Sequence, residues 1–207
     1  MPRLDYSDPA VWASTYKLKK ASDPEVWATG YERDCSMFPA AVEAAAQIIT
    51  VLGINASHRI GIIGAGYGWI ANQIAQQSGC VVAAVDTSGV IQSGKAVNAD
   101  IEILNIDVSG NNGRNQVRQA LGLSGQNKAS FVITEEVITI LDDAEAQQLS
   151  TFLHNLSDNV VHWTTVRNDK KLADGNQDPR FNWHSIAEWK ALLPGDLFIV
   201  AGTAVLA

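Results

Sequence analysis

The stretch from residue 60 to residue 77 constrains the fold of this chain more than any other part of the sequence. It opens with the apolar run IGII at 60–63, continues through GAGYG at 64–68 and ends in a helix-like segment at 72–77. A short apolar run of this kind indicates a strand that is buried in a parallel sheet. The three alternating glycines let the backbone turn tightly and lie against a bulky group. The stretch therefore predicts a strand, a glycine turn and a helix in succession.

A second apolar segment follows this helix and ends in an acid. It reads CVVAAV at 80–85, and the next residue is Asp86. In α/β proteins, a glycine turn after one strand and an acid at the end of the next are typical of a site that holds a nucleoside. The two features together favour a nucleoside-containing cofactor.

The spacing of the glycines distinguishes between such cofactors. A dinucleotide site follows the pattern G-x-G-x-x-G, in which the third glycine allows close packing of helix and strand. Counted from Gly64, that third glycine would stand at position 69, where the chain has Trp69, and the third glycine is instead Gly68. The pattern G-x-G-x-G weighs against a nicotinamide or flavin oxidoreductase, which stays as the alternative interpretation.

The rest of the chain alternates between strand-like and helix-like segments. The expected strands are 60–63, 80–85, 101–106, 129–133, 159–166 and 197–201, with 203–206 as further strand material, and the expected helices are 39–52, 72–77, 111–121, 142–154 and 185–193. Such alternation predicts an α/β fold with a doubly wound, mostly parallel sheet of seven or six strands and helices on both faces. This domain is expected to span residues 39–207.

Residues 1–38 form a separate, helical N-terminal extension in this interpretation. The segment SDPAVWASTY at 7–16 recurs as SDPEVWATGY at 22–31, with seven of ten positions identical. Each copy opens with residues that begin helices and places Trp and Tyr four positions apart, on one helical face. We expect two short helices that pack on the core or act as a lid over the site.

Composition narrows the range of partners. The chain has 207 residues, 46% of them hydrophobic, and a formal net charge of −7, which disfavours a nucleic-acid partner because such proteins need a basic face. No apolar run has the length of a membrane span, and no Cys/His cluster has the spacing of metal ligands. We expect a cytoplasmic protein with reduced cysteines that needs neither a membrane nor a metal.

The motifs described above resemble those of class I S-adenosylmethionine-dependent methyltransferases. That family has a strand followed by G-x-G-x-G and an acid at the end of the second strand, and the resemblance covers residues 39–207. It implies S-adenosylmethionine (SAM) as the cofactor and S-adenosylhomocysteine (SAH) as its product. It also implies cofactor contacts from the turn, namely Gly64, Ala65, Gly66, Tyr67 and Gly68.

Further cofactor contacts follow from the same resemblance. Asp86 matches the acid that accepts hydrogen bonds from both ribose hydroxyls, and Thr87 stands beside it. Asp107, after the third strand, matches the acid that takes the adenine amino group, with the backbone of Val108 next to it. Apart from the resemblance, Tyr31 and Arg33 lie at the end of the duplicated segment of the extension and are expected to close over the carboxylate of the cofactor.

The fourth motif, TEEV at 134–137, follows the fourth strand and would face the transferred methyl group. Glu135 is therefore the first candidate for a base and for a cofactor contact, and His162, in the fifth strand, is the second. The motif lacks the Asn/Asp-Pro-Pro pattern of enzymes that methylate base amino groups, so a small molecule or a protein is the expected acceptor. Ile62 stands where the family usually has an acid, which keeps a non-catalytic, cofactor-binding member as a further alternative.

Overall fold

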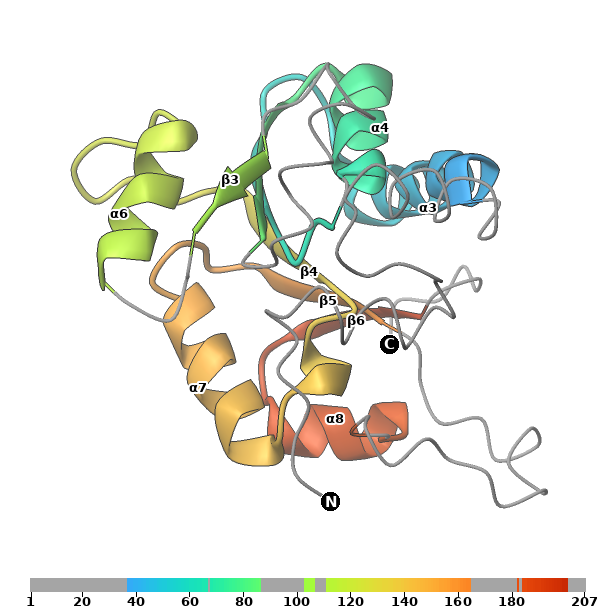
Figure 1. Cartoon of the computed structure of the whole chain (residues 1–207), viewed down its shortest axis with the longest axis vertical. Helices are drawn as coiled ribbons and strands as arrows, with labels where there is room; N and C mark the ends of the chain where they lie inside the picture. The colour runs from blue at the N-terminus through green and yellow to red at the C-terminus, as the bar shows by residue number, and fades with distance from the viewer. Residues whose placement is uncertain are drawn as a thin grey trace, which may run out of the picture.

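A computed structural model describes residues 37–66, 68–86, 103–106, 111–164, 182 and 184–200. In chain order the elements are α3 (Met37–Leu52), β1 (Arg59–Ile63), α4 (Trp69–Ser78), β2 (Val81–Asp86), β3 (Ile103–Asn105), α6 (Asn111–Ala120), β4 (Phe131–Glu135), the 3-10 helix η1 (Ile138–Ile140), α7 (Asp143–Leu153), β5 (Val160–Thr164), α8 (Ile186–Leu192) and β6 (Leu197–Val200) (Figure 1). The duplicated segment and the last expected strand, 203–206, lie outside the described residues.

The six strands form one sheet in the order β3-β2-β1-β4-β5-β6, and every neighbouring pair is parallel. The predicted doubly wound α/β fold is therefore confirmed. The chain runs outward from β1 to β3 on one side and then crosses to β4 on the other side of β1. In open sheets, ligands bind at the carboxyl ends of the strands where the order reverses in this way. This point is the carboxyl end of β1, where the glycine turn begins.

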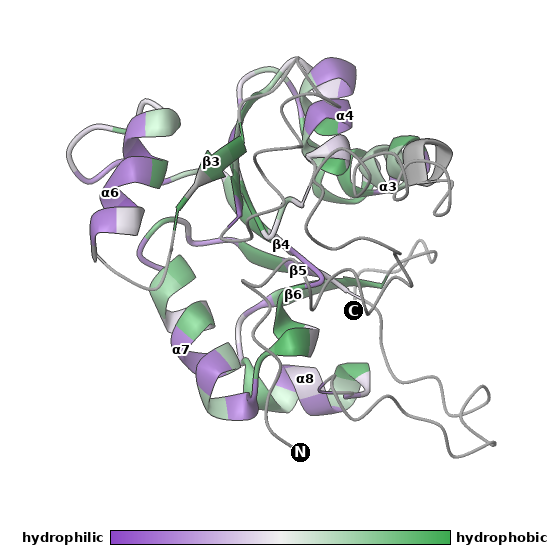
Figure 2. Cartoon of the chain, in the orientation of Figure 1, coloured by the Kyte–Doolittle hydropathy of each residue, from purple (hydrophilic) through white to green (hydrophobic). Residues whose placement is uncertain are grey.

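Helices cover both faces of the sheet (Figure 1). On one face, α3 and α4 pack on buried side chains such as Ile62, Ile133 and Val161. On the other face, α6, α7 and α8 cover two further apolar clusters, which include Val132 and Phe198. Figure 2 shows the strands as mainly hydrophobic, whereas α6 and α7 alternate between hydrophobic and hydrophilic residues, as expected for helices with one face in solvent.

Local sequence signals explain several element boundaries. Asp142 with Glu145 and Ser185 with Glu188 form capping boxes at the starts of α7 and α8. Helix α4 begins at Trp69, three residues earlier than expected, because Gly68 takes a left-handed conformation at its N-cap (φ 74°) and starts the helix directly after the turn. The Trp69 side chain is buried in the core beneath α3.

Candidate functional site

The glycine turn after β1 depends on its glycines for two different reasons. Gly64, Gly66 and Gly68 all have positive φ angles (76°, 52° and 74°), which side chains rarely allow. A Cβ atom on Gly64 would overlap with Cγ2 of Val137 and would lie 3.0 Å from the carbonyl oxygen of Glu135. Gly64 therefore lets the segment that follows β4 pack directly against the turn.

Gly66 faces open space instead. Apart from Gly66 itself and its two neighbours in the chain, no atom of the described residues lies within 4 Å of the position that its Cβ would occupy. Its backbone N–H donates a 2.8 Å hydrogen bond to Oδ2 of Asp86, which is half-buried at the end of β2. The turn and the acid are thus joined at the carboxyl ends of two adjacent strands. Together they leave room beside the glycine that a ligand could fill.

Glu135, the last residue of β4, brings a second carboxyl group to this edge of the sheet. Its Oε2 atom is buried and has no hydrogen-bond partner in the described structure. Burial raises the pKa of this carboxyl well above its usual range, and the negative charges of Asp86 and Glu136 raise it further. Glu135 thus lies close enough to Asp86 for the two carboxyl groups to interact across β1.

The backbone is strained directly after Glu135. Glu136 has a φ of 54°, and no other non-glycine residue among those described has a positive φ. Such a conformation costs about 1–3 kcal/mol and persists only where the surroundings enforce it. Here the N–H of Glu136 donates to the carbonyl oxygen of Trp163 at 3.0 Å, and the hydroxyl of Thr164 donates to its Oε2 at 3.4 Å. The end of β5 therefore holds the backbone bend at Glu136, directly after β4.

Trp163 lies beside Glu135 and was missed by the sequence analysis. The two residues are register partners in the parallel sheet, so their side chains leave the same face. In the described structure, three buried side-chain nitrogen or oxygen atoms lack a hydrogen-bond partner, and two of them are Oε2 of Glu135 and Nε1 of Trp163. Buried polar atoms of this kind call for an explanation, and a ligand that bonds to them is one. Strand register, which the sequence does not reveal, creates this pair.

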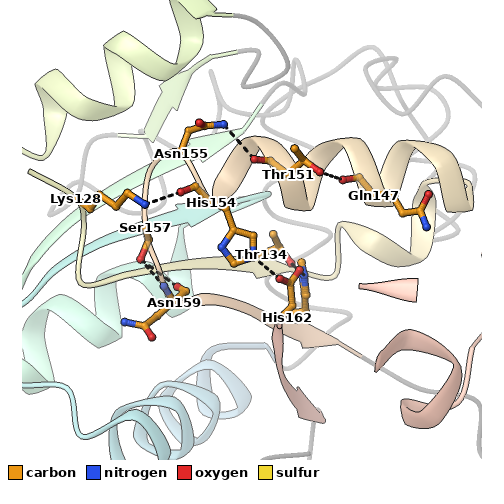
Figure 3. Close-up of polar contacts among 10 residues, drawn as sticks. Lys128, Thr134, Gln147, Thr151, His154, Asn155, Ser157, Asn159 and His162 are labelled. Carbon is orange, nitrogen blue, oxygen red and sulfur yellow. Dashed lines mark hydrogen bonds and ion pairs between the residues drawn. The ribbon is translucent and has the colours of Figure 1, made fainter. Parts of the chain in front are cut away.

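His162 takes part in a buried network on the opposite face (Figure 3). Its Nδ1 lies 2.7 Å from Oγ1 of Thr134, and its Nε2 lies 2.8 Å from Oδ2 of Asp196, whose other oxygen lies 2.7 Å from Nε2 of His154. The side chains of His162 and Asp196 are fully buried. A histidine bonded at both ring nitrogens beneath a helix does not reach the carboxyl edge of the sheet. This placement argues for a structural role and against the predicted catalytic one.

Asp196 carries the charge of this network. Burial alone would raise its pKa, but hydrogen bonds from His162, Ser150 and His154 outweigh burial, so the pKa of Asp196 lies below its usual value. The network ties the end of α7 and the segment before β6 to the middle of β5. The network thus links these three segments of the domain through polar contacts.

Six of the predicted cofactor contacts lie outside the described residues, namely Tyr67, Thr87, Asp107, Val108, Tyr31 and Arg33. Ile62, at the position where the related motif has an acid, is 1% exposed and packs in the core beneath α3 and α4. Ala65 is also buried, at 2% exposure, so its side chain supports the turn from within.

In the described part of the chain, no group of three or more His, Cys, Asp or Glu side chains could hold a metal ion.

Solved structures of methyltransferases have the same fold. Magnesium protoporphyrin IX methyltransferase from Synechocystis PCC 6803 with bound SAH is 16% identical, with 87% of this chain and 79% of that chain covered and a TM-score of 0.53. A putative O-methyltransferase from Nostoc punctiforme PCC 73102 is 15% identical, with 82% and 53% covered and a TM-score of 0.58. Human N-acetylserotonin methyltransferase in complex with SAM is 11% identical, with 88% and 51% covered and a TM-score of 0.56.

No protein-family model and no curated protein matches this sequence. The chain spans about half the length of the Nostoc and human proteins, at 53% and 51%. None of the helices described in the structure has the length and apolarity of a membrane-spanning helix. The arrangement of strands, the glycine turn and the structural neighbours agree on one fold, and the chain has the fold of class I S-adenosylmethionine-dependent methyltransferases.

Proposed function

We propose that this chain is an S-adenosylmethionine-dependent methyltransferase that holds the cofactor between the glycine turn and Asp86. The observation that carries the proposal is the 2.8 Å hydrogen bond from the N–H of Gly66 to Oδ2 of Asp86, beside open space at the glycine. A carboxylate suits two ribose hydroxyls because it accepts several hydrogen bonds at once. The turn aligns that carboxylate before any ligand arrives.

Other residues are proposed to complete the cofactor site. The backbone of Gly64, Ala65 and Gly68 supplies the rest of the turn. Tyr67, Thr87, Asp107 and Val108 remain predictions from the family resemblance, and Tyr31 and Arg33 remain predictions from their place at the end of the duplicated segment. The nicotinamide or flavin alternative is not favoured, because Trp69 stands in place of the third glycine and is buried.

When bound, SAM supplies an electrophilic methyl group on a positively charged sulfur atom. The part of the protein is to hold the acceptor in line with that group and to remove a proton from the acceptor. Glu135 is the proposed base, because its carboxyl lies at the same edge of the sheet as Asp86 and its Oε2 atom has no hydrogen-bond partner in the described structure. Trp163 is proposed to donate its indole N–H to the acceptor molecule, beside Glu135 in the sheet.

The acceptor is proposed to be a small molecule or a protein side chain. Asp86 and Glu136 concentrate negative charge at the carboxyl edge, and the whole chain carries −7, so phosphate groups would be repelled. Cys80 is buried and not in a disulfide, which supports a reducing location such as the cytoplasm.

Calorimetric titration of the purified chain with SAM, SAH and NADH tests the proposal. We expect both adenosyl ligands to bind in the micromolar range, and Asp86→Ala to abolish that binding. Asp158→Ala is the matched control, because Asp158 is an exposed acid that precedes β5, at the amino edge of the sheet. Binding of NADH alone would support the oxidoreductase alternative. Binding of SAM without transfer to any acceptor would support a non-catalytic member.

A further inference from the structure

Glu135 sits in surroundings that favour its neutral form. Its Oε2 atom is buried and unpartnered in the described structure, and the charged groups that act on it, Asp86 and Glu136, are both acids. An ionised carboxylate without a partner is costly to bury, so such a group keeps its proton until a positive charge arrives. The described residues near it supply no such charge.

None of the described elements around Glu135 brings a positive charge to its carboxyl group. The described residues of the turn after β1 and of the first turns of α4 are uncharged. On β5, the register partner is Trp163, and the titratable His162 leaves the opposite face to bond with Asp196. The charged residue of α3 is Glu43, which is exposed and acidic. Any positive charge at Glu135 must therefore come from outside these elements.

We propose that Glu135 is a base controlled by the charge of the cofactor. In the free protein it holds a proton, it releases this proton when the positively charged sulfonium of SAM binds, and it takes up a proton from the acceptor during methyl transfer. This inference rests on the proposed function and adds to it the means by which the base is activated. It also distinguishes the charged cofactor from its neutral product, because only the first stabilises the carboxylate.

The proton and charge balance of this cycle closes. During transfer, a bond forms between the acceptor's oxygen or nitrogen and the methyl carbon, the carbon–sulfur bond breaks, and its electron pair stays on sulfur. Glu135 accepts the proton that the acceptor loses. Before the step the sulfonium carries one positive charge and the Glu135 carboxylate one negative charge. After the step both groups are neutral, which suits a buried site. The proton released to solvent in each turnover is the one that Glu135 gives up when the cofactor binds.

Proton release on binding gives a direct test that needs no acceptor. The full chain is titrated with SAM and with SAH by calorimetry, at one pH in two buffers with different ionisation enthalpies, and then over a range of pH. At pH values below the pKa of Glu135 in the free protein, SAM should release up to about one proton more than SAH does. Affinity for SAM should rise with pH by up to about tenfold per pH unit through Glu135, whereas affinity for SAH should not.

Glu135→Gln should remove this difference between the two ligands, because it keeps the shape of the side chain and cannot ionise. Glu136→Gln is the matched control, which should keep the proton release but move it to lower pH, because one repelling charge is gone. Infrared difference spectra of the wild-type protein give a second readout. The C=O band of a protonated carboxyl should disappear on addition of SAM and persist with SAH.

The possible outcomes separate the two ideas. If SAM and SAH both bind with equal proton release, or if Glu135→Gln behaves as the wild type does, the inference is wrong and the proposed function stands. If neither ligand binds, the proposed function fails and the inference fails with it. Should the glutamine variant not fold, the infrared comparison of the wild-type protein still decides.

Discussion

The N–H of Gly66 donates a hydrogen bond to Oδ2 of Asp86 at 2.8 Å, so the turn after β1 is joined to the last residue of β2. Gly66 follows the carboxyl end of β1, where the strand order of the sheet reverses, and Asp86 ends the neighbouring strand. The bond holds a carboxylate beside a glycine whose side-chain position is open. A nucleoside site requires both, and the consequences of altering either can be measured.

Gly66→Ala should weaken SAH binding by more than about tenfold, because the added methyl group enters the proposed cofactor space. The positive φ makes the change cost about 1–2 kcal/mol of stability as well. Gly125→Ala is the matched control, since Gly125 has a φ of 57° and equally open surroundings but lies before β4, away from the site. Calorimetry and urea unfolding measure the two effects. Equal SAH affinity in both variants would contradict the assignment of this space.

Gly64→Ala should lower the free energy of unfolding by more, about 2–5 kcal/mol. The new Cβ atom would overlap with Val137, and the positive φ at this position is itself unfavourable for alanine. Adding Val137→Ala removes the side-chain part of the clash and should restore part of the stability. Urea unfolding of the single and double variants gives the coupling between the two positions. Strictly additive effects would show that the segment after β4 does not pack on the turn.

Asp196→Asn should reduce the free energy of unfolding by about 3–5 kcal/mol near neutral pH, because it removes the charge of a fully buried carboxylate that is paired with His162. The pKa of Asp196 is lowered by folding, so its stabilising effect exists above its unfolded pKa and is lost as the pH falls through its folded pKa. The variant should therefore lose less stability in acid than the wild type does. Asp158→Asn, which alters an exposed ion pair with Lys128, should cost less than about 1 kcal/mol.

Glu135→Gln should have the opposite dependence on pH in the absence of cofactor. Folding raises the pKa of Glu135, so this carboxyl destabilises the fold increasingly as the pH rises from its unfolded pKa to its folded pKa. The variant lacks this penalty, and its stability relative to the wild type should grow over that pH window. Urea unfolding as a function of pH provides the measurement. A constant difference between the two proteins would mean that Glu135 is ionised at ordinary pH.

Much of the fold could be predicted from the sequence because its signals are local. Apolar runs, glycines and helix-capping residues act within a few positions, and they located all of the described strands and helices except the short η1. The spacing of the glycines against Trp69 and the acid at the end of β2 depend only on chain order. They identified the fold and the pairing of the turn with Asp86.

Tertiary structure decided what several of those residues do. Gly64 was assigned to the cofactor from the sequence alone, and the structure adds that a Cβ atom there would overlap with Val137, which lies close because β4 pairs with β1. It offered His162 as a base, but the alternation of the strand turns that side chain toward Asp196, whereas the next residue, Trp163, joins Glu135. Contacts between strands distant in sequence depend on register and burial, which no local pattern encodes. Local sequence thus determined the order of the elements, whereas packing determined the partners of the site residues and the direction in which the pKa of Glu135 is shifted.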